Sequence, residues 1–595
     1  MSLPHAIGWL ATALVGATGL AWTWGTWPHA YVDFGRELYV PWQLTEGAVL
    51  YRDIAWFNGP LSAYWNTLLF ELFGPGLRIL VLANLAAVIA LVAILHGLLR
   101  RTTGRFSAFV GVGVFLSLFA FNRIDAIGND NYLTPYSHEV THGLILSLAA
   151  LLAFAHQRAR PVRAALVCGT LLGLVALTKA EIFIAALGGI LVAFLLDPRA
   201  RKLSVVAALL AAMAAPLFAS FALLQLAMPP AAALQGTLGA WPALFESGVA
   251  SQHFYGVTLG LIGLDENLLR LLSWSVAWGL VIAAVSGLSL SLRSTKEGGR
   301  GSWDERIVLG GVFVGTWAVT AWAAGALAAS WPDFLRPLPL AMAALAIASA
   351  GEALRTTRRE GRIALRTGLL VFAGLLLAKL ALRVRLDQYG FALAMPATMA
   401  MVGLLLGTLP RWVERRGGDG RVARAAALGV VATVVLGLAP IVSARTSERS
   451  EAIGRGRDAF LTDATLAPVL EELAAVLRER QSHETLAVLP EGVMINYLGR
   501  RVNPTGHVNF MPPELLIFGE DRILEAFRRN PPDLVALAHK DTREYGVGFF
   551  GKGYARELYG WVETNYEPIA LFGDPPLEAG SLFGVRLLER KPIVR

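Results

Sequence analysis

The sequence predicts an α-helical polytopic membrane protein, with about 13 transmembrane helices, followed by a C-terminal α/β domain. Its composition is the first indication: 55% of the 595 residues are hydrophobic and only 16% are charged, whereas soluble domains carry about 25% charged residues. The mean hydropathy is +0.53. The second indication is a series of apolar runs near the ~20 residues that cross a bilayer. The third is a change to a more polar sequence from about Ser443.

The apolar runs occupy the predicted membrane domain, residues 1–442. The run at 106–121 is short, and the stretch 164–196 reads either as one long kinked helix or as two spans separated by Lys179. We favour two spans, because merging them would invert the sidedness of every later loop. The expected spans are 6–27, 77–99, 106–121, 139–155, 164–178, 180–196, 203–228, 268–292, 307–329, 337–351, 367–382, 391–409 and 425–442.

Basic residues gather in alternate loops between these spans. The loop 410–424 holds five arginines, for example, whereas the loop 229–267 holds neither Lys nor Arg. Cytoplasmic loops are enriched in Lys and Arg, so the N-terminus is expected in the cytoplasm and the C-terminal domain outside. The same loops explain the net charge of +8 without a nucleic-acid partner. The expected cytoplasmic loops are 100–105, 156–163, 197–202, 293–306, 352–366 and 410–424, and the outer ones are 28–76, 122–138, 179, 229–267, 330–339 and 383–390.

Residues 443–595 are predicted to form a separate soluble, extracytoplasmic α/β domain. Short apolar runs predict strands at Thr485–Leu489, Leu534–Ala538 and Leu582–Leu588, and Glu520–Arg529 has the periodicity of an amphipathic helix. No Gly-rich phosphate loop in a strand–loop–helix setting accompanies them. The only cysteine, Cys168, lies in a predicted span, so no disulfide framework is expected. The polar stretches Asn496-Tyr497, Asn503-Pro504 and Asp541–Tyr545 either contact a substrate or form turns, and we favour turns.

The first outer loop, residues 28–76, is rich in charged and aromatic side chains. It opens with Asp33-Phe34-Gly35-Arg36-Glu37 and continues through Arg52-Asp53 to Asn58-Gly59-Pro60. One interpretation is an interfacial belt, with Trp side chains at the lipid headgroups and Arg36 paired with a neighbouring acid. The other is a site at the bilayer surface, in which Asp33 acts as a base and an arginine binds phosphate.

These residues resemble the polytopic GT-C glycosyltransferases, which take a sugar from a polyprenyl-phosphate carrier, and in particular the protein O-mannosyltransferases and the lipid A aminoarabinose transferase. The resemblance lies in the Asp-x-Gly-Arg-Glu element at 33–37, in Leu50-Tyr51-Arg52-Asp53 and in Gly59-Pro60-Leu61, and it is strongest over residues 1–200. It implies a GT-C fold in a bacterial inner membrane, a polyprenyl-phosphate sugar donor, and a glycan, lipid or protein acceptor.

The resemblance also implies roles for single residues. Asp33 would be the general base that deprotonates an acceptor hydroxyl, and Glu139 a supporting acid. Displacing phosphate from an anomeric carbon develops positive charge on the sugar and negative charge on the leaving group, which a carboxylate and cations stabilise. The resemblance implies no definite cofactor, and a divalent cation at Glu139 or Asp130 stays open. The expected substrate-binding residues are Arg36, Glu37, Arg52, Asp53, Lys179, Asp130, His138, Arg336 and Tyr389.

Two of these assignments keep an alternative. Lys179 has Glu181 as a nearby partner, which would make the pair structural instead of phosphate-binding. The family often has an Arg-Tyr pair before a proline near its last spans; Asp387-Gln388-Tyr389 keeps the tyrosine but moves the arginine to 385.

Two other function classes also stay open. His138-Glu139-Val140-Thr141-His142 is a literal His-Glu-x-x-His, the spacing with which a helix offers two imidazoles to zinc. A membrane metalloprotease is therefore an alternative, although Pro135 puts the motif at the membrane boundary and no third-ligand motif follows. A non-catalytic transporter of lipid-linked sugars is the second, but transporter sites usually lie near the midplane on broken helices.

Overall fold

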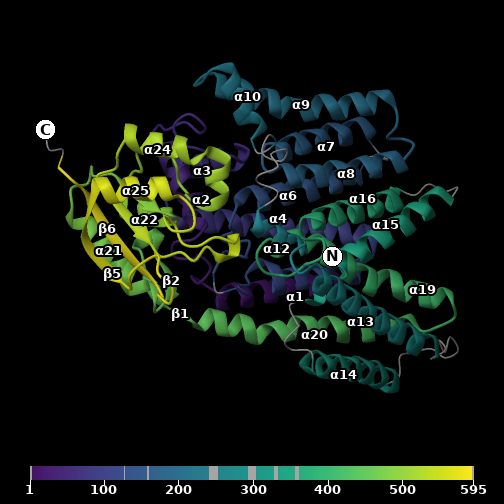
Figure 1. Ribbon diagram of the computed structural model, residues 1–595. Coiled ribbons are helices and arrows are strands. Elements are labelled where there is room, and N and C mark those ends of the chain that lie inside the picture. Colours follow the sequence, from purple (N-terminus) through teal and green to yellow (C-terminus); the bar gives the residue numbers. More distant parts are fainter. Residues whose placement is uncertain are drawn as a thin grey trace.

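The computed structural model describes residues 3–125, 127–156, 160–239, 241, 252–291, 303–326, 333–355 and 361–592. It consists of a bundle of long helices with a C-terminal domain at one end (Figure 1). We call that end of the bundle the domain end and the other the far end. The last long helix, α20 (Gly420–Ser447), leads directly into strand β1 (Arg449–Ile453), so the change of character expected at 443 falls within the end of this helix.

The apolar helices follow the expected spans in order. Among the described residues, nine are long and apolar enough to cross a membrane, and four shorter apolar helices lie at Arg105–Ala120, His138–Phe154, Pro161–Ala176 and Ala180–Leu196. The predicted fold class, a multi-pass helical membrane protein with a C-terminal α/β domain, is confirmed. The bundle comprises α1 (Leu3–Trp22), α4 (Leu77–Thr102), α5 (Arg105–Phe115) with η1 (Leu116–Ala120), α6 (His138–Phe154), α7 (Pro161–Ala176), α8 (Ala180–Leu196), α9 (Leu203–Gln225), α13 (Leu264–Ser291), α14 (Trp303–Ala326), α15 (Leu338–Arg355), α16 (Gly361–Leu376) with η4 (Leu377–Leu380), α18 (Met395–Gly403), η5 (Leu404–Thr408), α19 (Leu409–Arg415) and α20.

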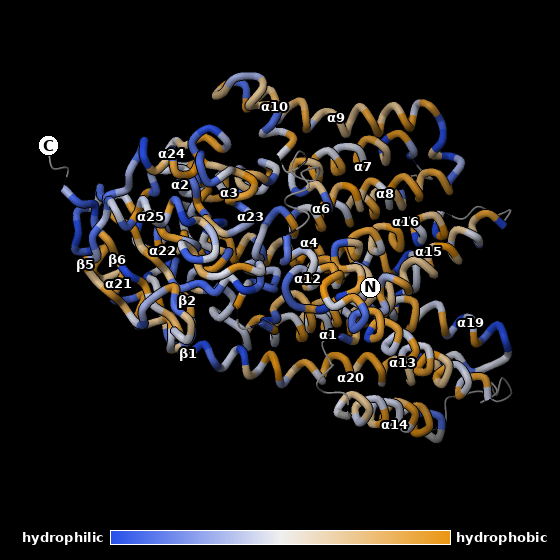
Figure 2. Tube along the Cα trace, viewed as in Figure 1, coloured by the Kyte–Doolittle hydropathy of each residue, from blue (hydrophilic) through white to orange (hydrophobic). Residues whose placement is uncertain are grey.

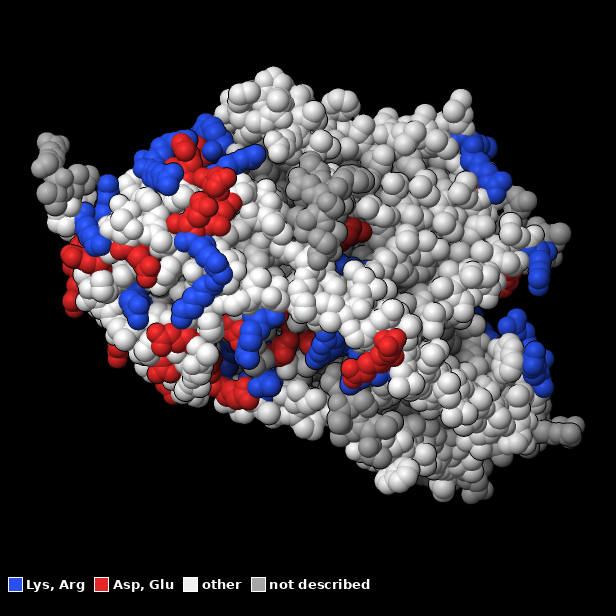
Figure 3. All heavy atoms as spheres, in the orientation of Figure 1, with Lys and Arg blue, Asp and Glu red and all other residues white. Residues whose placement is uncertain are grey.

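The outer surface of the bundle is apolar, as a lipid-facing surface must be. Hydrophobic residues line the helices of the bundle, whereas the C-terminal domain mixes both classes (Figure 2). Large apolar side chains such as Leu226 (84% exposed), Trp322 (78%) and Ile347 (74%) would promote aggregation in water. Charged atoms gather over the C-terminal domain and at the far end, with a broad, mostly uncharged band between them (Figure 3). This band is the part of the surface that suits a bilayer.

Close helix contacts inside the bundle depend on small residues. Gly169 and Gly173, spaced as G-x-x-x-G on α7, face α9, and a Cβ at either position would lie 2.3 Å from a carbonyl oxygen of that helix. Membrane helices use such spacing because lipid gives them no hydrophobic drive to associate, so close van der Waals packing must hold them together.

The two predicted sets of loops lie at opposite ends of the bundle. At the far end, Arg362 and Arg411 donate hydrogen bonds to the backbone of Thr102 and Thr103, which joins three of the expected cytoplasmic loops. The outer loops meet at the domain end. Which end faces the cytoplasm stays a prediction. The loop 293–306 for the most part, parts of the loops 156–163, 229–267, 330–339 and 352–366, and the end of the span 307–329 lie outside the described residues.

The C-terminal domain is built on a four-stranded sheet with the order β3-β4-β6-β5. The strands β3 (Leu486–Leu489), β4 (Leu534–Ala538) and β6 (Gly584–Arg590) and the helix α24 (Glu520–Arg529) confirm the four predicted elements. β3 and β4 pair in parallel, whereas β6 pairs antiparallel with both β4 and β5. A second, two-stranded sheet pairs β1 with β2 (Phe460–Asp463). Besides these two strands, the elements that the sequence did not predict are β5 (Tyr566–Gly573), η6 (Gly456–Asp458), α21 (Leu466–Glu479), α22 (Val493–Gly499), α23 (Pro512–Phe518), η7 (Arg543–Tyr545) and α25 (Arg556–Asn565).

The first outer loop folds into short helices that dock against this domain. These helices are α2 (Phe34–Thr45) and α3 (Leu61–Phe73). α2 packs so closely on α22 that a Cβ at Gly35 would lie 2.4 Å from the backbone nitrogen of Met494. Asn503 donates its backbone N–H to the Tyr39 hydroxyl at 2.8 Å. The remaining short helices at the domain end are α10 (Pro230–Leu238), α12 (His253–Leu259) and α17 (Gly390–Leu393).

Two of the stretches interpreted as turns have other roles. Asn496 and Tyr497 lie inside helix α22 and are buried. The buried Asn496 side chain is satisfied, because it donates to two backbone carbonyls of its own domain. Asp541–Tyr545 does form a turn, η7, but Tyr545 lines a cavity between the two parts of the molecule.

Candidate functional site

A polar cavity of about 430 Å³ lies between the domain end of the bundle and the C-terminal domain. Both parts contribute to its walls. The bundle and its outer loops supply acids, bases and aromatic rings, and the C-terminal domain supplies further acids. The lining residues are Asp33, Arg36, Phe57, Asn58, Tyr136, Lys179, Glu181, Phe254, Tyr255, Leu259, Lys379, Tyr389, Glu491, Asn509, Met511, Pro513, Glu514, Ile517 and Tyr545.

Asp33 occupies a strained backbone position at the edge of this cavity. Its φ of 60° and ψ of −76°, with a 2.8 Å hydrogen bond from the Phe34 N–H to the Val32 carbonyl, define a classic-type γ-turn, which is rare and strained. Strain of this kind persists only where the surroundings enforce it, and it concentrates at functional sites. The turn fixes the direction of the Asp33 side chain just before α2 begins.

The Asp33 carboxylate is poised for proton transfer. Among the described residues, no donor hydrogen-bonds to it. Burial and the neighbouring Glu491 carboxylate raise the pKa of Asp33 from 3.8 to about 7, against the opposing charge of Arg36. Glu491 also accepts a long 3.4 Å hydrogen bond from the Asp33 backbone N–H and lies 3.3 Å from the Lys540 ammonium. A carboxyl group with a pKa near neutrality suits a general base.

Arg36 is held in place by a chain of buried polar groups. It donates to the Tyr136 carbonyl at 2.9 Å and lies 3.4 Å from Glu37. Glu37 in turn accepts from His138 Nδ1 at 2.7 Å, while His138 Nε2 faces the Asn84 amide at 2.8 Å. The Asn66 side-chain amide also lies 3.1 Å from His138 Nδ1, so Glu37, Asn66 and Asn84 together hold the ring in place. Glu37 and His138 are therefore not part of the cavity lining, and they orient Arg36 from the side that faces away from the cavity.

Two lysines face the cavity beside Arg36. Lys379 lies 2.9 Å from Glu181 and 4.3 Å from the centre of the Tyr389 ring, whereas Lys179 lies 3.8 Å from the same Glu181 oxygen. Burial lowers the pKa of Lys179 to about 8. The single negative charge of Glu181 is shared between the two lysines and lies closer to Lys379. It therefore does not neutralise both positive charges. Arg36, Lys179 and Lys379 together form what we call the cationic wall, set against the acids Glu37 and Glu181.

A tight backbone contact places Lys179 in this wall. The Gly59 N–H donates to the Thr178 carbonyl at 2.8 Å, and the Leu61 N–H donates to the Leu177 carbonyl at 3.1 Å. A Cβ at Gly59 would lie 2.2 Å from the Leu177 oxygen. Glycine is needed here for close approach, so the Gly59-Pro60 element serves to seat the turn that carries Lys179.

Seven of the expected site residues lie outside the lining: Glu37 and His138, described above, and five others. Glu139 is fully buried and accepts from the Ser137 hydroxyl at 2.5 Å. Asp130 is buried against the Gln388 backbone. Arg52 and Asp53 form an exposed ion pair at 2.7 Å, and Arg336 binds Asp333 at 2.7 Å and the Leu382 carbonyl at 2.8 Å. Functional roles for these residues stay predictions.

The His-Glu-x-x-His motif forms the start of α6. His138 and His142 stack at 5.2 Å between ring centres, and His142 Nδ1 lies 3.1 Å from the Ser62 hydroxyl. Both ring nitrogens of His138 already face protein partners. Within the described ranges, no three His, Cys, Asp or Glu side chains come together as a metal site. A zinc role would therefore require breaking the Glu37–His138–Asn84 chain.

Sequence reasoning missed several cavity residues. Lys379 had a readable signal, since it interrupts the apolar run Leu376-Leu377-Ala378 and a charge within a span is a functional hint by default. Glu181 was noticed only as a partner for Lys179. Tyr545 lies in a stretch for which the sequence favours a turn over a substrate contact. Glu491 and Glu514 carried no signal, because nothing local in a polar segment tells which side chain will face another domain.

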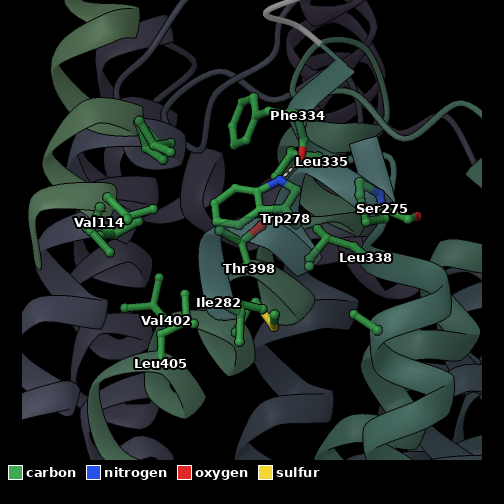
Figure 4. A pocket seen from close by; sticks show the side chains of 18 of the residues that line it. Val114, Ser275, Trp278, Ile282, Phe334, Leu335, Leu338, Thr398, Val402 and Leu405 are labelled. Atoms are coloured by element: carbon green, nitrogen blue, oxygen red, sulfur yellow. Dashed lines mark hydrogen bonds between the residues drawn. The ribbon is translucent and has the colours of Figure 1, made fainter. Parts of the chain in front are cut away.

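A second cavity, of about 340 Å³, lies within the bundle among α13, α15, α18 and α20 (Figure 4). Its lining contains no titratable side chain. The Trp278 indole N–H donates to the Phe334 carbonyl at 2.9 Å, so this polar group is satisfied. The groups able to do acid–base chemistry thus belong to the polar cavity.

Comparison with known proteins gives distant structural likenesses only. No family model matches the sequence, and no curated protein matches it. An oligosaccharyltransferase from Archaeoglobus fulgidus, solved with a tethered acceptor peptide, is 14% identical with a TM-score of 0.49, over 98% of this chain and 74% of that chain. ArnT from Cupriavidus metallidurans, solved with undecaprenyl phosphate, is 12% identical with a TM-score of 0.44, over 98% of both chains.

Proposed function

We propose that the protein is an integral membrane glycosyltransferase of the GT-C type, which moves a sugar from a polyprenyl-phosphate donor to an acceptor hydroxyl or phosphate. One observation carries the proposal: a single cavity at the domain end joins the poised carboxylate of Asp33 to the cationic wall of Arg36, Lys179 and Lys379. A base and a phosphate-binding wall are the two parts that such a transfer needs. The sequence resemblance in the loop around Asp33 supports the same class.

The chemistry follows from the two walls. For a hydroxyl acceptor, its oxygen forms a bond to the anomeric carbon of the sugar while the bond from that carbon to the phosphate oxygen breaks. The acceptor proton passes to Asp33. The electron pair of the broken bond stays on polyprenyl phosphate, and Arg36, Lys179 and Lys379 stabilise the added negative charge. The products are a glycoside and polyprenyl phosphate.

The proposed orientation places the domain end, with the cavity and residues 443–595, outside the cytoplasmic membrane and the N-terminus inside. It rests on the basic loops at the far end. A lipid-linked donor explains why the cavity adjoins the bundle, since the polyprenyl chain stays in the bilayer while its sugar phosphate reaches the surface. A protease applied to spheroplasts, whose outer membrane has been opened, should then remove a tag at the C-terminus, and protection of that tag would reverse the orientation.

Transfer of radiolabelled sugar tests the proposal. Purified protein in lipid nanodiscs is given short-chain polyprenyl-phosphate donors and a total membrane extract as the source of acceptors. We expect labelled glycoside from the wild type and from Glu71→Gln, an exposed acid of the same loop on α3 and outside the cavity, but not from Asp33→Asn.

The alternatives give different results with the same purified protein, which is reconstituted into vesicles for the transport assay. A lipid transporter would move labelled donor across a vesicle membrane without forming a glycosidic bond. A metalloprotease would cleave peptide in a manner that depends on His138 and is lost with a chelator. Either result, with no sugar transfer by the wild type, would overturn the proposed function.

A further inference from the structure

The C-terminal domain forms the wall of the polar cavity that faces the cationic wall. Glu491 enters from the loop after β3, and Tyr545 from η7. The segment Asn509–Ile517, which includes most of α23, supplies the rest of this wall. This segment is anchored to its own domain, because the Phe510 N–H donates to the Pro490 carbonyl at 2.9 Å.

Glu514 is the acid of this segment, and one of its two carboxylate oxygens has no hydrogen-bond partner among the described residues. Two prolines begin α23 and set the backbone direction, so Glu514 falls at the third helical position. Asn509 donates its side-chain amide to Glu514 Oε1 at 3.0 Å. The other oxygen, Oε2, is buried and has no hydrogen-bond partner among the described residues. The side chain as a whole is only 8% exposed.

A buried carboxylate oxygen without a partner is costly and calls for an explanation. Burial raises the pKa of Glu514 to about 7, and the charge of Arg36 opposes this rise. Arg36 and Glu514 both line the cavity, so the charge of Arg36 acts on Glu514 across it. Oε2 has almost no accessible surface as the side chain stands. Because Glu514 lines the cavity, a small shift of its carboxylate would let a hydrogen-bond donor on a substrate satisfy this oxygen and remove the cost.

The position of the cationic wall indicates which substrate brings the hydrogen-bond donor for Oε2. If the donor phosphate binds Arg36, Lys179 and Lys379, the sugar ring attached to it must extend from that wall into the cavity. A pyranose or furanose ring carries hydroxyl groups around its edge, and its faces suit aromatic rings. Tyr389 lies by the cationic wall, and Tyr545 and Phe254 stack on each other at 5.0 Å at the cavity lining.

Building on the proposed function, we propose that Glu514 recognises the sugar of the lipid-linked donor by accepting a hydrogen bond from a ring hydroxyl. The membrane part then binds the phosphate that all lipid-linked sugar donors share, and the C-terminal domain recognises the sugar. Glu514 is thus a specificity-determining residue. Asn509 is a positioning residue that binds Oε1 and leaves Oε2 without a partner among the described residues.

Differential lipid binding tests this assignment. The probes are a short-chain polyprenyl phosphate without sugar and the same lipid carrying a hexose, a pentose or an N-acetylhexosamine, and affinities are measured on the full-length protein in nanodiscs. We expect the wild type to bind at least one sugar-bearing lipid more tightly than the bare lipid. In Glu514→Gln this preference should fall about tenfold, the usual effect of one hydrogen bond to a charged group, while the affinity for the bare lipid stays unchanged.

Glu514→Gln is the informative variant because it keeps the shape of the side chain. Asn509 would still donate to the amide oxygen, so the NH₂ group would replace Oε2 and offer a hydroxyl hydrogen no acceptor. Glu525→Gln, on the exposed face of α24 and paired only with Arg529, is the matched control. Equal midpoints of thermal unfolding would show that both variants are folded.

The outcomes separate the two proposals. If the wild type binds the bare lipid but shows no preference for any sugar, or if Glu514→Gln keeps the preference, the role of Glu514 is wrong and the proposed function stands. If the wild type does not bind polyprenyl phosphate at all, the proposed function itself fails. A Glu514→Gln variant that loses affinity for bare and sugar-bearing lipid alike would also overturn the assignment, because the residue would then serve the phosphate or the fold.

Discussion

The ionisation of Asp33 should control the rate of sugar transfer below neutral pH. Burial and Glu491 raise the pKa of Asp33 to about 7, and only the ionised carboxylate can accept a proton. Because the pKa is raised, the active form is lost as the pH falls through about 7. At a pKa of about 7, roughly half of the carboxyl groups are ionised at neutrality and about 1% at two pH units below. The rate should therefore fall about tenfold for each pH unit on the acid side.

Asp33→Asn should remove both the activity and its acid dependence. Loss of a general base typically lowers the rate by about 10²–10⁴-fold, which corresponds to roughly 3–5 kcal/mol of transition-state stabilisation. The assay is single-turnover transfer of radiolabelled sugar at saturating donor over a range of pH. Glu514, whose pKa is also raised to about 7, is the necessary control, and Glu514→Gln should keep the acid dependence of the transfer step.

The reasoning would be refuted by either of two results. One is an Asp33→Asn enzyme that transfers sugar within about threefold of the wild-type rate, which is far less than removal of a general base costs. The other is an acid limb that persists unchanged in the residual activity of Asp33→Asn. In that case another group carries the proton.

Three further predictions concern the surroundings of Asp33. Burial lowers the pKa of Lys179 to about 8, so its positive charge should be lost as the pH rises through about 8, and transfer should fall on the alkaline side; Lys179→Arg should abolish this alkaline limb because arginine stays charged, and an unchanged limb would exclude Lys179 as its source. Removing a like charge in Glu491→Gln should lower the pKa of Asp33 and move the acid limb of the pH–rate profile to lower pH; a shift in the opposite direction would contradict the electrostatics. In Gly59→Ala the new Cβ would lie 2.2 Å from a carbonyl oxygen, so we expect a loss of roughly 1–3 kcal/mol in stability and a lower midpoint of thermal unfolding, whereas Gly113→Ala, in helix α5 with open space around it, should unfold at the wild-type midpoint or slightly above it, because alanine favours a helix.

The membrane helices were predictable because the bilayer imposes a strong local rule. A backbone in hydrocarbon must satisfy its own hydrogen bonds, so a run of apolar residues of sufficient length becomes a helix whatever its neighbours are. The split at Lys179 was also predictable, and the structure confirms it as a break between α7 and α8. In the soluble domain only the most apolar strands and the strongly amphipathic α24 were predictable, since shorter elements depend on tertiary packing.

The site was predictable only where the charge was conspicuous. Asp33 and Arg36 lie in a charged loop directly after a span, and Lys179 interrupts two apolar runs. The charged pair Arg52–Asp53 is as conspicuous in the sequence, yet its side chains bind each other at the surface. Charge density in a loop thus indicates the region of a site but not which charges turn inward.

The sequence by itself determined that this protein is a helical membrane bundle with a terminal α/β domain, and that its notable carboxylate, Asp33, follows the first span. The tertiary structure alone decided that Lys379, Glu491 and Glu514 meet Asp33 around one cavity, from positions far apart in the chain. The physical reason is the range of the interactions. Apolar length and backbone hydrogen bonding act locally and are written in each segment, whereas the pKa of Asp33 and the unused oxygen of Glu514 arise only when two separately folded surfaces exclude water between them.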